Sequence, residues 1–124
     1  MILEFIKTSP AQNTTVIVTS FCPKSYYSAV AEKAMSYDYL NAEQVGFIVP
    51  PSKTDSLIGL EMAGGEFCGN ATLSAAAYAV YKGLVNKQYF NIDVSGADEP
   101  IRCKVIKLID YCYNASCTMP KAKQ

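Results

Sequence analysis

Apolar residues recur along the chain with two different periods, and the periods separate strands from helices. Short runs that alternate or are rich in β-branched residues indicate strands, at residues 2–6, 15–19, 44–49, 57–62, 89–94, 101–109 and, more weakly, 111–119. Two runs have helical character, residues 26–35 and residues 73–84. Proline-containing pairs such as Ser9-Pro10 and Pro50-Pro51 mark breaks between these runs.

The element order β-β-α-β-β-α-β-β-β predicts an α+β fold. The first two strands are joined by a polar turn at residues 11–14, which favours a hairpin. The second helix carries apolar residues in nearly every direction around its axis, interrupted only by Ser74. A helix that is apolar all round is typically buried. We therefore expect a curled, barrel-like mixed sheet around one central helix.

Chain length indicates the number of domains, and net charge limits the classes of partner to which the protein could bind. The 124 residues suit one domain, covering 1–124. Eleven basic residues balance eleven acidic ones, so no overall field attracts nucleic acid or an anionic membrane. A small-molecule partner is favoured. With no signal peptide and no apolar run near the length of a membrane span, we expect a cytoplasmic protein.

Histidine and cysteine usage limits the chemistry. The chain has no histidine, which excludes Ser-His-Asp and Cys-His sites within it and removes the commonest metal ligand. Its five cysteines show no Cys-x-x-Cys spacing, which suits neither a disulfide framework nor a zinc site. Most of them are interpreted as small buried hydrophobes, namely Cys22, Cys103, Cys112 and Cys117.

Cys68 is different, because it sits between glycines and directly before the alanine-rich helix. Residues 64–72 read Gly-Gly-Glu-Phe-Cys-Gly-Asn-Ala-Thr. The first N–H groups of a helix have no partner within it, and its dipole favours negative charge there. A thiolate is favoured at such a place, so Cys68 is a candidate base or nucleophile. Gly69 would let a ligand approach the backbone, and the N–H groups that follow could hold a carboxylate.

Four polar residues have a structural interpretation beside a functional one. Asn13 is either a turn residue or a ligand contact. Glu43 and Gln44 either sit at a strand edge or bind substrate, Gln44 being the better candidate. Thr72 either caps its own helix turn or contacts ligand.

The motif that contains Cys68 resembles one found in a known superfamily. Cys68-Gly69-Asn70, at the head of a helix after a strand and a glycine turn, resembles the first active-site motif of the diaminopimelate epimerase-like fold. That superfamily includes cofactor-independent amino-acid racemases and epimerases, proline racemase-like enzymes and phenazine-biosynthesis isomerases. Asn13 falls where the epimerases carry a substrate-binding Asn, and Glu43-Gln44 where they carry an Asp-Gln pair.

Within the superfamily, the chain is most similar to the histidine racemases of opine-metallophore (staphylopine-type) biosynthesis. The likeness lies in residues 43–47, 66–72, 94–96 and 119–120. Phenazine-type isomerases are less similar, since they lack a cysteine at the position of Cys68.

The resemblance implies a two-base mechanism without pyridoxal phosphate or another cofactor, and without a metal. One cysteine thiolate removes the α-proton of an amino acid, and a second cysteine thiol returns a proton to the opposite face. Cys68 would be one of the two catalytic cysteines. The residues implied to bind substrate are Asn13, Gln44, Gly69, Asn70, Ala71 and Thr72, with Glu43 as a further candidate.

The chain differs from diaminopimelate epimerases in ways that concern its substrate and whether it contains the whole active site. Diaminopimelate epimerases continue the motif with Gly and a nearby Arg, where this chain has Ala71-Thr72-Leu73. Histidine or a related amino acid is therefore the expected substrate, with diaminopimelate as the alternative. Family enzymes have two similar domains with one cysteine each, and this chain resembles the N-terminal one. The second cysteine would come from another domain or chain, which leaves a homodimer open.

Two hypotheses of other classes stand beside the racemase. The chain could be a non-catalytic domain that binds an amino acid, or a thiol-redox protein that uses Cys68. A redox pair usually has a resolving cysteine at a recognisable spacing, and the sequence shows none, which counts against the redox hypothesis and leaves the binding domain open.

Overall fold

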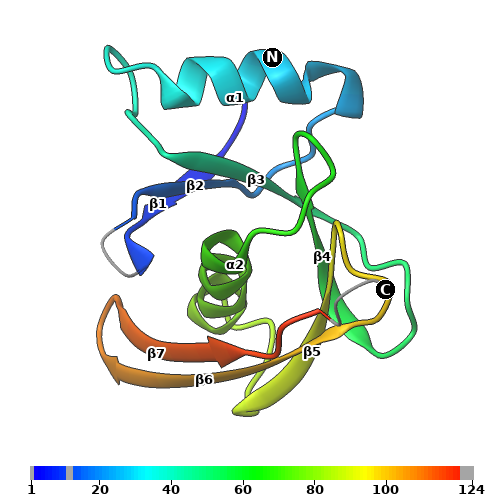
Figure 1. Ribbon diagram of the computed structural model, residues 1–124. Helices are drawn as coiled ribbons and strands as arrows, with labels where there is room; N and C mark the ends of the chain where they lie inside the picture. Colours follow the sequence, from blue (N-terminus) through cyan, green and yellow to red (C-terminus); the bar gives the residue numbers. More distant parts are fainter. Residues whose placement is uncertain (1, 11–12, 121–124) are drawn as a thin grey trace.

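The computed structural model describes residues 2–10 and 13–120, and the protein forms a seven-stranded sheet curled around one helix (Figure 1). The centre of the predicted turn, residues 11–12, and the tail, residues 121–124, lie outside the described residues. The strands are β1 Phe5–Thr8, β2 Thr15–Val18, β3 Gln44–Val49, β4 Ser56–Met62, β5 Tyr89–Val94, β6 Ile101–Ile109 and β7 Cys112–Cys117. The helices are a 3-10 turn η2 Lys24–Tyr26, α1 Tyr27–Met35 and α2 Gly69–Tyr81.

The strands lie side by side in the same order as in the chain. Neighbours are antiparallel except for the pairs β2–β3 and β4–β5, which are parallel. Parallel neighbours need a long crossover, and each of these two pairs is joined through a helix. The expected α+β fold and the β1–β2 hairpin are therefore confirmed.

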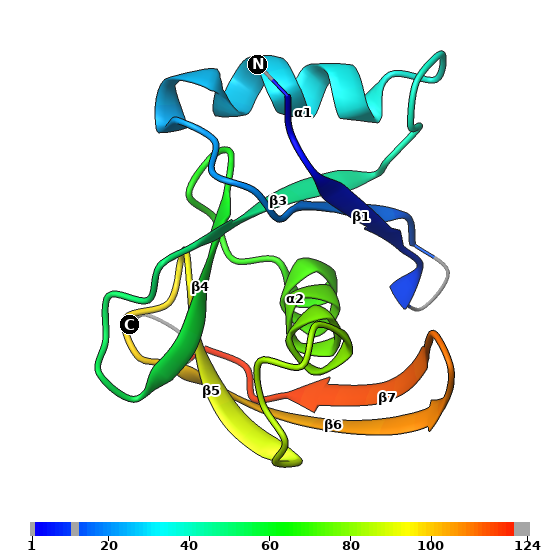
Figure 2. The same cartoon turned by 180° about the vertical axis from the view of Figure 1, so that it is seen from behind.

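The two helices cover opposite faces of the curled sheet. α1 lies outside β2 and β3, while α2 lies inside the curl, as both views show (Figures 1 and 2). Successive side chains of β2 therefore point to opposite faces of the sheet. Val16 and Val18 pack in the cluster around α1, and Ile17 packs in the cluster around α2. On the α1 side the rings of Tyr27 and Phe47 stack with their centroids 3.8 Å apart.

The central helix begins earlier than its propensity suggests. The apolar run predicts a helix over residues 73–84, but the helix begins at Gly69, although glycine, asparagine and threonine are weak helix formers. It ends as a Schellman motif: Gly83, with φ of +76°, donates to the carbonyl of Val80 at 3.0 Å, and Leu84 donates to that of Ala79 at 2.9 Å.

Near its C-terminal end, α2 is buried on one face and exposed on the other. Ala71, Ala75, Ala76 and Ala79 are all 0 % exposed, which confirms that alanines let the sheet approach closely. The prediction of burial in every direction was wrong at Tyr81, which is 51 % exposed. Among the described strands, β1 and β7 do not pair to close the sheet, so this face of the helix lies at the opening.

Four strands also differ from their predicted bounds, β2 and β4 by one residue each. The first strand is Phe5–Thr8 rather than residues 2–6, because pairing with Thr15–Val18 sets its register. The last strand is shorter than predicted, and the β6–β7 ladder shifts register between Lys107 and Ile109. None of the helices in residues 2–10 and 13–120 is long and apolar enough to span a membrane.

Candidate active site

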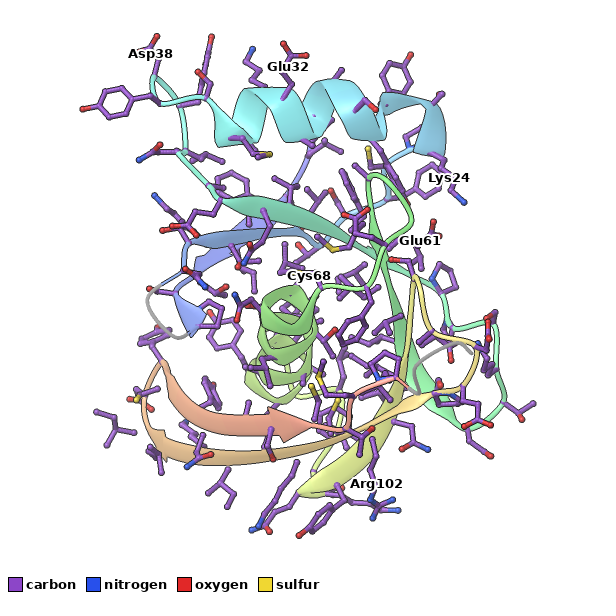
Figure 3. All side chains as sticks on the ribbon, in the orientation of Figure 1. Lys24, Glu32, Asp38, Glu61, Cys68 and Arg102 are labelled. Atoms are coloured by element: carbon purple, nitrogen blue, oxygen red, sulfur yellow. The ribbon has the colours of Figure 1, made fainter. Side chains whose placement is uncertain are left out.

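Cys68 is the N-cap of α2, at the end of the helix that the chain enters from β4 (Figure 3). Its backbone is extended, with φ −134° and ψ 114°, and its sulfur accepts a hydrogen bond from the N–H of Ala71 at 3.5 Å. The side chain is half-buried and packs against the inner core cluster. The thiol is thus held at the positive end of a buried helix while remaining partly accessible.

The first turn of α2 divides its N–H groups into two sets. Ala71 donates to the sulfur of Cys68, and Thr72 donates to the carbonyl of Cys68 at 3.0 Å. No helix carbonyl precedes Gly69 and Asn70 at the distance that an intrahelical hydrogen bond needs. The N–H groups of these two residues therefore have no partner within the helix. These two N–H groups, rather than those of Ala71 and Thr72, are the donors that the helix leaves for an anion.

Ala71 and Thr72 hold the turn rather than face outward. Both are 0 % exposed. The hydroxyl of Thr72 donates to the carbonyl of Cys68 at 2.8 Å, which agrees with the structural interpretation of this residue. Their expected contact with substrate stays a prediction.

Gly69 has open space beside it. A Cβ built at this position would meet only a ring carbon of Phe67, at 3.9 Å, which is ordinary contact. Within the described residues, packing therefore gives no reason for a glycine at this position. Open space for a molecule that approaches the helix from outside does give a reason for glycine there.

Gln44 is oriented by a chain of polar contacts that leads to α2. Its Nε2 donates to Oγ1 of Thr15 at 2.6 Å, and the carbonyl of Thr15 accepts from the hydroxyl of Thr8 at 3.2 Å. The hydroxyl of Thr8 also lies 2.7 Å from that of Ser74, which is buried in α2. Ser74 and Asn70 are four residues apart and share a helix face. The structure thus links Gln44 to the face of α2 that carries Asn70.

Asn13 and Glu43 lie at the same edge of the sheet, near the starts of β2 and β3. The N–H of Asn13 donates to the carbonyl of Pro10 at 2.8 Å, a turn contact. The N–H of Glu43 donates to the carbonyl of Thr14 at 2.9 Å, and its side chain is exposed. Both remain candidates by position.

Sequence reasoning missed two residues that hold the loop before Cys68. Ser95 and Gly96 follow β5 and contact the backbone of residues 66–67. Their only sequence signal was the match of residues 94–96 to the histidine racemases, which carried no assigned role.

The other cysteines lie in different surroundings. Burial, with a smaller contribution from Cys117, raises the pKa of the Cys103 thiol to about 12, and burial raises the pKa of Cys117. The interpretation of Cys112 as a buried hydrophobe was wrong, since Cys112 is exposed on β7. Nowhere in residues 2–10 and 13–120 do three or more His, Cys, Asp or Glu side chains gather as a metal site would require.

A groove of about 540 Å³ runs along α2 at the opening between β1 and β7. Its lining includes Thr8, Ser74, Tyr78, Tyr81 and Tyr113, but not Cys68. The groove and the thiol are therefore separate features of this domain.

Two solved structures share the fold of this chain. A methylitaconate-delta-isomerase superposes on 83 % of this chain and 33 % of its own, with a TM-score of 0.64 at 10 % identity. A phenazine biosynthesis protein of the PhzF family from Enterococcus faecalis covers 75 % of this chain and 34 % of its own, with a TM-score of 0.55 at 16 % identity. At these identities the likeness establishes the fold alone.

Sequence comparison identifies the family. Residues 2–124 match the family described as "Histidine racemase CntK N-terminal domain", and the chain belongs to that family. A histidine racemase of Staphylococcus aureus (strain Mu50) is 35 % identical over 105 residues, which is 84 % of this chain and 38 % of that protein. The chain thus spans well under half the length of this relative.

Proposed function

We propose that the chain is the N-terminal half of a cofactor-independent amino-acid racemase, in which Cys68 exchanges the α-proton of histidine or a related amino acid. The observation that carries the proposal is the placement of Cys68 as the N-cap of a buried helix, beside the N–H groups of Gly69 and Asn70. The family match supports an amino acid as the substrate.

In the proposed mechanism the thiolate of Cys68 takes the α-proton and becomes a thiol. The electron pair left on the α-carbon spreads into the substrate carboxylate. The N–H groups of Gly69 and Asn70 stabilise this developing charge, as in an oxyanion hole. A second cysteine thiol returns a proton to the opposite face and ends as a thiolate, so one proton is taken and one is given back.

Gln44 is proposed to hold the substrate's amino group. Its Nε2 already donates to Thr15, which leaves the carbonyl oxygen of the amide as an acceptor for an ammonium group. Asn13 lies at the same edge and is proposed to help, while the exposed Glu43 is the weaker candidate. Ala71 and Thr72 contribute by fixing Cys68.

The second cysteine is proposed to lie in the remainder of a longer protein. The Staphylococcus aureus relative is covered over only 38 % of its length, which leaves room for a second domain. A homodimer that completes the site is the alternative. We place the reaction in the cytoplasm, where thiols stay reduced, and in opine-metallophore biosynthesis, as the resemblance implies.

The test is loss of the α-proton NMR signal in D₂O for histidine, diaminopimelate, proline and alanine. It is run with this chain, with the longer protein and with the longer protein carrying Cys68→Ser. We expect the longer protein to exchange histidine or a relative of it. We expect Cys68→Ser to lower that rate by about 10²–10⁴-fold, the usual contribution of an acid–base residue.

Three outcomes separate the hypotheses. Exchange by the longer protein but not by this chain would make the chain half of an active site. Full exchange by Cys68→Ser would overturn the catalytic assignment. Binding of an amino acid without exchange by either protein would favour a non-catalytic binding domain.

A further inference from the structure

The hydroxyl of Ser95 joins both ends of the loop that leads to Cys68. It accepts a hydrogen bond from the N–H of Met62 at 3.0 Å, where β4 ends, and donates to the carbonyl of Glu66 at 2.6 Å. The N–H of Ser95 donates to the carbonyl of Leu60 at 2.9 Å. One side chain, directly after β5, therefore fixes the loop at its start and two residues before the thiol.

Gly96 brings the same segment close to the backbone of the loop. Its φ is +78°, and a Cβ there would overlap the nitrogen of Phe67 and lie 2.9 Å from the carbonyl carbon of Glu66. Only glycine permits this approach. The same segment carries the hydroxyl of Ser95, which donates to the carbonyl of Glu66.

Besides a turn hydrogen bond from the N–H of Gly65 to the carbonyl of Met62 at 3.0 Å and the packing of Phe67 against the inner core cluster, the described loop has few other contacts. Residues 63–66 are all exposed, and Gly64 and Gly65 have no side chain to pack. Gly65 has φ of +77°, and a Cβ there would meet nothing within 4 Å. The Ser95 hydroxyl is therefore a principal restraint on the path between β4 and Cys68.

We propose that Ser95 is a positioning residue for the acid–base thiol. By holding the carbonyl of Glu66, it sets where the sulfur of Cys68 lies relative to the N–H groups of Gly69 and Asn70. This inference rests on the proposed function for its catalytic consequence. Misplacement of a reacting group by about 1 Å can cost about 100-fold in rate.

The first test measures racemisation by the complete enzyme, this domain together with the remainder of the longer protein. Ser95→Ala should lower kcat by about 10–100-fold with little change in KM, because the thiol is displaced while substrate contacts remain. Ser95→Thr keeps the hydroxyl and should recover most of kcat. Ser20→Ala is the matched control, since the hydroxyl of Ser20 also accepts from a backbone N–H, that of Glu4 at 2.8 Å, but joins other segments.

The second test needs no catalysis. The rate at which iodoacetamide alkylates Cys68 is followed in the same protein from pH 6 to 9, by mass spectrometry of the peptide that contains it. Ser95→Ala should change this rate profile by about threefold or more, because thiol reactivity follows its surroundings, whereas Ser20→Ala should leave it unchanged.

The two tests fail in different ways. An unchanged alkylation profile in Ser95→Ala would overturn the positioning role, whatever happens to the melting temperature. A wild-type enzyme that racemises no amino acid would overturn the proposed function, while the alkylation profile would still decide whether Ser95 positions Cys68.

Discussion

The carboxylate of Asp93, on β5, accepts a hydrogen bond of 2.6 Å from the backbone N–H of Ser52, which lies 41 residues earlier in the chain. The same oxygen accepts from the N–H of Lys53 at 2.9 Å, and the other oxygen accepts from the hydroxyl of Ser56 at 2.5 Å. Asp93 is 7 % exposed. It therefore ties the loop before β4 to β5, the strand that directly precedes Ser95.

These contacts predict that acid destabilises the domain through Asp93. Burial raises the pKa of this carboxyl, but the hydrogen bonds from Ser56, Lys53 and Ser52 lower it and prevail, so the folded pKa lies below the ordinary value. The stabilisation is present above the unfolded pKa of about 3.9 and is lost as pH falls through the lower folded value. Urea unfolding at pH 7 and in steps below pH 4 measures this loss.

Asp93→Asn should remove that pH dependence. We expect it to lower the free energy of unfolding at pH 7 by about 1–3 kcal/mol, because hydrogen bonds to a buried charge are lost. The exposed Asp98→Asn is the control and should change little. An acid response in Asp93→Asn equal to that of the wild type would contradict the prediction.

Ala76→Leu tests the packing of α2. Ala76 is 0 % exposed inside the curl, so three added carbon atoms must displace the sheet, and overpacking should cost about 1–3 kcal/mol. Ala77→Leu, one residue on and half-buried at the groove, should cost less. Equal melting temperatures for the two variants would argue against the enclosed position of this helix face.

Gly69→Ala tests whether glycine is needed at this position to let a ligand approach or to let the domain fold. Its Cβ would make only ordinary contact, with Phe67 at 3.9 Å, so thermal stability should be unchanged or slightly higher. Racemisation by the complete enzyme should fall, because the methyl group would occupy the approach to the helix. Gly83→Ala is the contrast: with φ of +76° and nothing within 4 Å of its Cβ, it should lose about 1–2 kcal/mol through backbone strain alone. Wild-type activity in Gly69→Ala would remove the evidence that substrate approaches at this position.

Cys103 should resist alkylation in the folded protein. Its thiol is 0 % exposed, and burial, helped by Cys117, raises its pKa to about 12. At pH 8 it therefore stays a protonated, enclosed thiol, whereas the exposed Cys112 should react. Peptide mass spectrometry after iodoacetamide treatment, with and without urea, checks this, and rapid labelling of Cys103 without urea would contradict the described core.

Local patterns predicted most of the fold. Three strands, β3, β5 and β6, have the predicted bounds, because each is a run rich in apolar and β-branched residues that is followed directly by turn or proline residues. Alanine content predicted that α2 is central, and the glycines around Cys68 predicted a loop that feeds a helix N-terminus. These features are encoded within a few residues of one another, where periodicity and backbone preference act.

Tertiary structure decided what depends on contacts between distant segments. The exposure of Tyr81 follows from an opening in the sheet that no local pattern encodes. Ser95 lies 29 residues from Glu66, and only the parallel pairing of β4 with β5 brings its hydroxyl to the loop before Cys68. The sequence by itself determined which residue types could do chemistry, and the curl of the sheet determined how they are held.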